Sequence, residues 1–264
     1  MNLHADIALS PRSLIDYDHG DNRHTLEGPR KAVRSIFQSR MPGSVLDVGC
    51  GIGTWLRAFL ELGVKDIFGI DGVDIPEAAL LFPAELFRKV DLTVPWALSR
   101  KFDVAFCLEV AEHLDETSSA LLIECLAHHA DNVVFSAACP GQPGQHHVNC
   151  QWPSYWQALF NDQGFTCSDA VRWQVWSDPV IDVWYRQNMF IATRNGVEAG
   201  KEPRLHAVVH PEFLDAFVAE GASVAVSQNI ANAEQGGFRF LWYVTSLLTA
   251  FQSKLRHRLP GSGA

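Results

Sequence analysis

Two adjacent histidines, His146 and His147, stand in the segment "GQHHVN" at residues 144–149 and are the side chains best suited to chemistry. An imidazole titrates close to neutral pH, so it can remove a proton from a reacting group, and it is also a common metal ligand. Its neighbours in the segment do not decide between these roles. The role depends on where the fold places this segment.

A glycine-rich turn lies upstream in "VLDVGCGIGTW", where an apolar strand runs through Asp47 into Gly49, Gly51 and Gly53 and then into a helix. Glycines permit positive φ and a close approach of the backbone to a ligand, beside a helix N-terminus with unpaired N–H groups. The D-x-G-x-G-x-G spacing differs from the G-x-G-x-x-G of dinucleotide sites. The turn therefore predicts a small-ligand site, and its structural alternative is a tight strand-to-helix connection without a ligand.

Two acidic residues follow the next strands. Asp71 in "FGIDG" ends the second strand, where a carboxylate can accept hydrogen bonds from both hydroxyls of a ribose. Asp91 and Leu92 in "KVDLTVPW" lie near the end of the third strand, where they could meet the amino group and the face of an adenine ring. The order of these residues indicates a nucleoside-containing ligand.

Short apolar runs alternate with amphipathic helical patterns from residue 44 onward, which is typical of βαβ units and a mainly parallel sheet. The runs "FTCSDAVRWQVW" and "VWYRQNMFIAT" are rich in β-forming residues, so we expect them to pair as an antiparallel hairpin at the sheet edge with no helix between them. We predict strands at 44–48, 66–70, 104–108 and 132–136. We predict helices at 54–62, within 117–130 with Asp115 or Thr117 as N-cap, and from Pro153 onward with Gly164 just past the end.

The bulk composition limits the class of protein. A chain of 264 residues with 47% hydrophobic content can bury a sizeable core, and a net charge of −9 makes nucleic acid a poor partner. The six cysteines form no C-x-x-C pair, which favours free thiols in a reducing compartment. No run reaches the roughly 18 to 20 apolar residues of a membrane span, so we expect a cytoplasmic protein.

The order of "VLDVGCGIGTW", "FGIDG", "VDLTVPW", "FDVAFCLEVAEHL" and the terminal β-hairpin resembles class I S-adenosylmethionine-dependent methyltransferases over roughly residues 25–194. The resemblance implies an α/β fold with a Rossmann-like, seven-stranded, mainly parallel sheet, a C-terminal antiparallel hairpin and helices on both faces. It also implies cofactor contacts from Gly49, Gly51 and Gly53 to the methionine part, Asp71 and Gly72 to the ribose, Asp91 and Leu92 to the adenine, Asp47 at the amino acid end, and Leu108 and Glu109 in the pocket wall.

The segment "FSAACPGQPGQHHVNCQW" can now be placed at the carboxyl edge of the sheet, where open α/β folds bind ligands. We predict that His146 or His147 is a catalytic base beside the methyl donor, and the sequence does not decide which. The segment also resembles "PGQ…HVN…YW" of bacterial methyltransferases that act on small molecules or sugar-containing precursors. Residues predicted to contact the acceptor are Asn149, Trp152, Tyr155 and His113.

A metal site is the alternative for this segment, since His146, His147, Glu109, Glu112 and His113 could converge. Adjacent histidines in an extended loop point to opposite sides, so at most one of the pair can bind a given ion without a special turn. We therefore assign no metal from the sequence.

The chain ends hold two further segments. We predict a lid or flexible segment at 1–24, the methyltransferase domain at 25–194, and a linker with a C-terminal helical extension at 195–264. Residues 238–251 are apolar and are followed by Lys254, Arg256 and Arg258. This pattern favours packing against the domain or against another subunit of a homo-oligomer, and its alternative is weak contact with the inner-membrane surface.

The main functional hypothesis is an S-adenosylmethionine-dependent methyltransferase that O-methylates a small-molecule or saccharide acceptor with a histidine base. One alternative is an NAD-dependent Rossmann oxidoreductase, which the glycine spacing and the antiparallel ending disfavour. Another is a non-catalytic S-adenosylmethionine-binding regulatory protein, which the polar acceptor loop disfavours.

Overall fold

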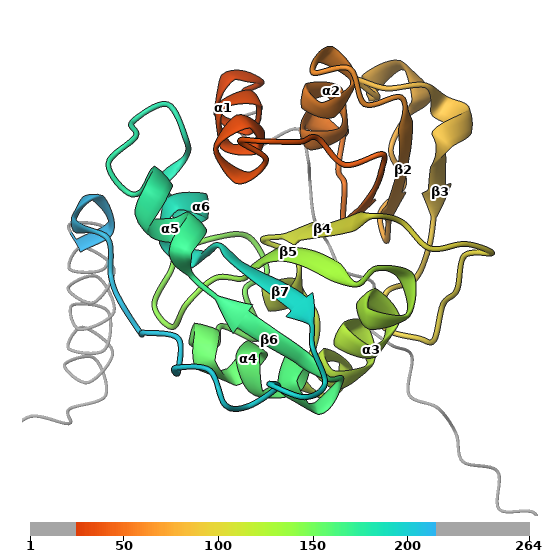
Figure 1. Ribbon diagram of the computed structural model, residues 1–264. Coiled ribbons are helices and arrows are strands. Elements are labelled where there is room, and N and C mark those ends of the chain that lie inside the picture. The colour runs from red at the N-terminus through yellow and green to blue at the C-terminus, as the bar shows by residue number, and fades with distance from the viewer. Residues whose placement is uncertain (1–24, 215–264) are drawn as a thin grey trace, which may run out of the picture. The chain divides into compact units, whose positions relative to one another are not determined.

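A seven-stranded sheet forms the centre of the computed structural model, which describes residues 25–214 (Figure 1). The first five strands are parallel, whereas β7 runs antiparallel to both β5 and β6. The strands follow the order β3-β2-β1-β4-β5-β7-β6, and their bounds are β1 Ser44–Val48, β2 Asp66–Asp71, β3 Phe87–Lys89, β4 Val104–Leu108, β5 Asn132–Ser136, β6 Phe165–Ser168 and β7 Phe190–Arg194.

Six α-helices surround the sheet in the described part of the chain. The bounds are α1 Glu27–Ile36, α2 Thr54–Glu61, α3 Ser119–His129, α4 Pro153–Asp162, α5 Ala170–Val175 and α6 Val183–Asn188. Short 3₁₀ turns complete the connections, and two of them, η4 (Ala111–His113) and η5 (Glu116–Ser118), follow β4 directly. Asp115 is the residue before η5, and α3 begins at Ser119, directly after η5.

The sheet separates two apolar cores, because alternate residues of each strand point to opposite faces. In β4, Phe106 joins the core shared with α1, α2 and α5, while Cys107 joins the core shared with α3 and α4. The Phe106 ring centroid lies 5.2 Å from that of Phe59 on α2, and on the other face Phe135 lies 5.3 Å from Trp156. The predicted mainly parallel sheet with helices on both faces is confirmed.

The antiparallel pairing of β6 and β7 is also confirmed, but the prediction that no helix separates them was wrong. Helices α5 and α6 occupy the second half of one β-rich run and the first half of the other. Val171 and Val175 lie one helical turn apart, and both are buried against the same core. Tertiary packing therefore overrides the strand preference of these β-branched and aromatic residues.

Residues 195–214 continue the same packed unit beyond the boundary that we predict at Arg194. Glu202 accepts hydrogen bonds from the side chains of Gln157 and Asn161 and from the backbone N–H of Cys167. Leu205 is buried in the α3–α4 core. The polar composition of this segment suggests a linker, but its few apolar and carboxylate groups attach it to the domain.

Other predictions fall on residues 1–24 and 215–264, which lie outside the described residues. These are the N-terminal lid segment and the apolar run at 238–251. Within residues 25–214, no helix combines the length and the apolar character that crossing a membrane requires.

Replacing Leu205 by alanine tests whether residues 195–214 belong to the domain. We expect Leu205→Ala to lower the free energy of unfolding by about 2–4 kcal/mol, because it removes buried methyl groups and leaves a cavity. Val197→Ala, at a side chain that is 74% exposed, is the matched control and should change stability by less than about 0.5 kcal/mol. Equal effects of the two substitutions in urea unfolding would mean that the segment does not contribute to the core.

Candidate active site

The turn between β1 and α2 is held by the end of β2. The backbone N–H groups of Gly49 and Cys50 donate to the carbonyl oxygen of Ile70 at 2.8 and 3.1 Å. The N–H of Gly51 donates to Oδ2 of Asp71 at 2.8 Å. Three successive amides of the turn are therefore fixed by β2, and the turn presents its Cα atoms and the first turn of α2 to the space above the sheet.

The glycines of this turn meet two different demands. Gly49, Gly51 and Gly53 have φ values of 74°, 52° and 84°, in the left-handed region where a side chain is strained. A Cβ on Gly49 would lie 2.3 Å from Cγ2 of Val110, and one on Gly53 would lie 2.2 Å from the ring of Phe82. Gly49 therefore lets the turn approach the chain that follows β4, whereas Gly53 allows a ring to pack against it.

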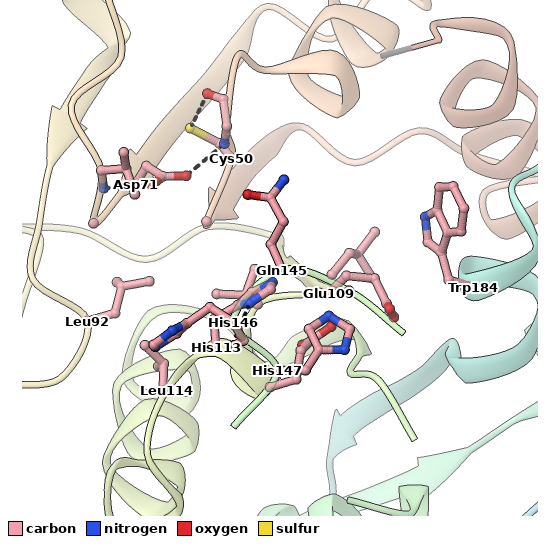
Figure 2. A pocket seen from close by; sticks show the side chains of 18 of the residues that line it. Cys50, Asp71, Leu92, Glu109, His113, Leu114, Gln145, His146, His147 and Trp184 are labelled. Atoms are coloured by element: carbon pink, nitrogen blue, oxygen red, sulfur yellow. Dashed lines mark hydrogen bonds between the residues drawn. The ribbon is translucent and has the colours of Figure 1, made fainter. Parts of the chain in front are cut away.

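A pocket of about 1000 Å³ lies at the carboxyl ends of β1 to β4, beside this turn (Figure 2). This volume is at the upper end of the usual range for ligand pockets, so it suffices for a cofactor together with a small acceptor. The sequence-predicted residues that line it are Asp47, Gly49, Gly51, Asp71, Gly72, Asp91, Leu92, Leu108, Glu109, His113, His146 and His147. The predicted residues that do not line it are Gly53, Asn149, Trp152 and Tyr155.

Three aspartates lie at or just past the carboxyl ends of β1, β2 and β3, on the glycine side of the pocket. Burial, with a smaller effect from the nearby Asp71, raises the pKa of Asp47 to about 8. Asp71 accepts from Gly51 through Oδ2 and from the backbone N–H of Val73 through Oδ1. Asp91 is exposed and accepts from both the backbone N–H and the hydroxyl of Thr93. Burial therefore makes the Asp47 carboxyl hold its proton far more tightly than an ordinary carboxyl group does.

Glu109 directly follows β4 and has φ 54°, an unusual conformation for a residue other than glycine. Its carboxylate accepts a hydrogen bond from Nε2 of Gln142 at 2.7 Å and another from Nδ2 of Asn188 at 3.2 Å. Asn188 also donates to the Gln142 side-chain oxygen at 2.8 Å. This triangle joins the loop after β5, helix α6 and the end of β4 at one wall of the pocket.

Glu112 holds the histidine loop through its backbone. Its carbonyl oxygen accepts the N–H groups of Val148 and Asn149 at 2.9 and 3.0 Å. Its side chain is fully buried, and among residues 25–214 neither carboxyl oxygen has a hydrogen bond of normal geometry. Burial and the neighbouring Glu109 raise the pKa of Glu112 well above its usual value, and nearby backbone groups of Glu112 and Ala138 offset this in part.

The three histidines of the site differ in what holds them (Figure 2). Nδ1 of His113 donates to the carbonyl oxygen of His146 at 3.3 Å, and burial followed by the nearby His147 lowers the pKa of His113 to about 4. Nδ1 of His147 donates to the carbonyl oxygen of Gln142 at 3.0 Å. His146 has φ 47°, and within residues 25–214 no hydrogen bond engages its imidazole. The left-handed backbone of His146 therefore points the imidazoles of His146 and His147 in different directions.

The other residues predicted to contact the acceptor make contacts within the fold instead. Asn149 is buried, and its amide donates to the hydroxyl of Ser119 at 2.9 Å. Trp152 is the N-cap residue of α4, and Tyr155 packs against Trp156 with ring centroids 4.9 Å apart. Trp156 is 1% exposed and belongs to the core shared with α3 and α4.

Several pocket residues were not anticipated from the sequence. Trp184 and Tyr185 lie on α6, and their pattern resembles a strand. Gln142 follows a Pro-Gly turn, and Phe213 lies beyond the predicted domain boundary. The one available signal was the pair of glutamines in "GQPGQ", which places amide groups on both sides of Pro143.

Comparison with known families identifies the class of this fold and pocket. A family model described as a methyltransferase domain matches residues 21–175, more than half of the chain. The chain belongs to this methyltransferase family and is an S-adenosylmethionine-dependent methyltransferase. This finding supports the main hypothesis over an NAD-dependent oxidoreductase or a non-catalytic binding protein. The comparison with curated proteins gives no significant match.

Solved structures share the fold at low sequence identity. A sugar N-methyltransferase from Streptoalloteichus is 18% identical with a TM-score of 0.51, covering 74% of this chain and 97% of its own. The magnesium protoporphyrin IX methyltransferase from Synechocystis, solved with bound S-adenosylhomocysteine, is 21% identical with a TM-score of 0.45, covering 64% and 84%. At these identities the likeness describes the fold.

Adding a methyl group to Gly49 tests the close approach of the turn to Val110. Gly49→Ala should destabilise the protein by about 2–4 kcal/mol, since it adds the strain of a left-handed alanine to an overpacked contact. Gly63→Ala is the matched control, because Gly63 has φ 93° and an added Cβ there would have no neighbour within 4 Å. Its cost should stay near 1 kcal/mol in urea unfolding, so equal losses would refute a steric role for Gly49.

Asp47→Asn tests the buried carboxyl through the pH dependence of stability. The pKa of Asp47 is about 8 in the folded protein and about 4 when unfolded, so the folded state holds its proton more tightly. Below about pH 4 the difference in unfolding free energy between wild type and Asp47→Asn does not depend on pH. Between about pH 4 and 8 the wild type loses stability relative to the variant as pH rises. Thermal unfolding of both proteins, with the exposed Asp162→Asn as control, should show the gap growing only for Asp47→Asn.

Proposed function

We propose that the protein transfers the methyl group of S-adenosylmethionine to a hydroxyl oxygen of a small or saccharide acceptor, with His146 as the base. The observation that carries this proposal is a single pocket lined both by the glycine turn and by three histidines. A hydroxyl acceptor must lose its proton during transfer, and an imidazole titrates close enough to neutral pH to take it.

The residues at the glycine side fit the cofactor. Gly49 and Gly51 have left-handed backbones and present no side chain to the pocket, which leaves room for the methionine part. Each oxygen of Asp71 accepts a backbone N–H bond, and a carboxylate oxygen has a second acceptor position for a ribose hydroxyl. The further assignments are Gly72 beside the ribose, Asp91 and Leu92 at the adenine, Asp47 at the amino acid end, and Leu108 and Glu109 in the wall near the reacting methyl group.

The chemistry requires alignment more than activation of the donor. When bound, the cofactor supplies a methyl group on a sulfonium, which is already a good leaving group. The residues of the chain must place the acceptor oxygen in line with that methyl group and remove the hydroxyl proton. The oxygen–carbon bond forms as the sulfur–carbon bond breaks, and the proton passes to the base.

His146 suits the role of base better than its two neighbours. The imidazoles of His113 and His147 are each held by a backbone carbonyl, whereas the His146 imidazole lines the pocket and makes no hydrogen bond within residues 25–214. The depressed pKa of His113 also makes it a weak proton acceptor at neutral pH. His146 therefore combines access to the acceptor with freedom to move.

The lining of the pocket favours a neutral, hydroxylated acceptor. Amide and carboxylate groups of Gln142, Gln145, Glu109 and Asp182 can accept or donate hydrogen bonds to hydroxyls, and Trp184 adds a flat apolar surface. These carboxylates and the net charge of −9 disfavour a phosphate-rich acceptor such as a nucleic acid.

Methylation assays with His146→Gln test the proposal. Monosaccharides and polyhydroxylated phenols should serve as acceptors, with methylated product identified by mass spectrometry. Because only a hydroxyl acceptor needs the base, we expect His146→Gln to lower kcat on it by about 10²–10⁴-fold. The affinity for S-adenosylhomocysteine, measured by calorimetry, should change by less than about twofold.

Two comparisons make this test specific. His128→Gln, at an exposed histidine of α3, should leave kcat unchanged. Amino sugars matched to the hydroxylated acceptors test the alternative of N-methylation, which needs only a neutral amine. Turnover of amino sugars alone would refute O-methylation, and an unchanged kcat of His146→Gln on a hydroxyl acceptor would refute His146 as the base.

A further inference from the structure

A second cluster of side chains lies within the histidine side of the pocket. Ligand-type atoms of Glu112, His113 and His147 all lie within 4.8 Å of one another. Glu112 and His113 come from η4 at the end of β4, and His147 comes from the loop between β5 and α4. All three line the pocket. Two imidazoles and one carboxylate are a ligand set for divalent transition metals, which accept both nitrogen and oxygen donors.

The backbone fixes this cluster independently of any ion. The Glu112 carbonyl binds the N–H groups of Val148 and Asn149, and this places the loop against η4. The left-handed His146 turns the chain between the two loop histidines, so that the His147 ring centroid lies 5.1 Å from that of His113. Gly144 leaves room for this arrangement, because a Cβ there would lie 2.1 Å from Nε2 of His147.

The Glu112 carboxyl group provides independent evidence for a bound ligand. It is fully buried, and among residues 25–214 neither of its oxygens has a hydrogen bond of normal geometry. A buried carboxyl group without a hydrogen bond of normal geometry is costly, and in native structures such groups commonly mark strain, a functional role or a bound water or ion. The nearby Glu109, held by Gln142 and Asn188, adds further negative charge on the same side. A cation would satisfy Glu112 and offset the repulsion between the two carboxyl groups.

We propose that Glu112, His113 and His147 bind one divalent transition-metal cation, and that its remaining coordination positions receive hydroxyl oxygens of the acceptor. Three protein ligands leave positions open, as in other metal sites that bind substrate. Coordination would orient an acceptor hydroxyl and make its proton easier to remove by His146. The part that concerns the acceptor rests on the proposed function, whereas binding of the cation does not.

Direct metal binding tests the site. The tag-free, full-length protein is treated with chelator and dialysed, and it is then titrated with Co²⁺, Mn²⁺ or Mg²⁺ in the presence of S-adenosylhomocysteine. Co²⁺ should bind at one equivalent and produce visible absorption bands of a nitrogen- and oxygen-coordinated ion. Mg²⁺ should bind more weakly, since imidazole ligands suit the transition metals better.

Substitutions identify the ligands. Glu112→Gln and His147→Ala should each weaken Co²⁺ binding by at least about 100-fold, since even the loss of a residue that only supports a ligand costs about 10- to 100-fold. His146→Ala is the matched control, because it removes the adjacent histidine of the same loop and should leave Co²⁺ affinity unchanged. Circular dichroism and affinity for S-adenosylhomocysteine report whether each variant is folded. If Glu112→Gln does not fold, the result for His147→Ala decides the test.

The outcomes separate this site from the proposed function. Failure of the wild type to bind Co²⁺ or Mn²⁺ below millimolar concentration overturns the site, even if the protein methylates an acceptor. Equal Co²⁺ affinity in the wild type and the folded His147→Ala also overturns it. Loss of the Co²⁺ bands in His147→Ala but not in His146→Ala supports the site, even if no hydroxylated acceptor is methylated.

Discussion

The pocket depends on the attachment of the glycine turn to the end of β2. Ile70 and Asp71 bind three successive amides of the turn, so parallel pairing of β1 with β2 determines where the turn lies. The carboxylate that we propose for the ribose thus also supports the backbone of the glycine turn. A change at Asp71 would therefore alter the shape of the site as well as its hydrogen bonding.

A second attachment sets the opposite wall. The carbonyl oxygen of Glu112 fixes the loop that carries His146 and His147, and this bond uses only the backbone. Two side chains of the loop add to this attachment, because His147 bonds the Gln142 carbonyl and Asn149 bonds the Ser119 hydroxyl, whereas the His146 side chain is not needed for it. Such an arrangement lets imidazoles occupy positions required for chemistry, because the supporting structure holds them in place.

Much of the fold could be predicted because the central strands are apolar on both faces. Strands at 44–48, 104–108 and 132–136 agree with their predicted bounds, and the order of glycines and acidic residues indicates the cofactor class. Helices α5 and α6 could not be predicted in this way, because their valines and aromatic residues are also typical of strands. Leu205 and Phe213 lie near other apolar residues that stay exposed, such as Val209 and Leu214, so no periodicity indicates which of them are buried.

The arrangement of the histidines could be predicted only in part. The position of the loop at the carboxyl edge follows from the order of the strands, and the divergence of adjacent side chains follows from extended geometry. The left-handed conformation of His146 has no compositional signal, since positive φ is uncommon for residues other than glycine. That conformation brings His147 beside His113, and it explains why residue types alone do not define the cluster.

Phe213 gives the end of the described chain a direct connection to ligand binding. The ring lines the pocket, and the segment just before it is attached to α6, because the His210 N–H donates to Gln187 and Glu212 forms an ion pair with Arg186. Consider a ligand that contacts Phe213 only when this segment is docked on α6. The free energy that docking adds to ligand binding then equals the free energy by which the ligand stabilises the docked segment. Any ligand that contacts the Phe213 ring would in this way be linked to the docking of residues 205–214.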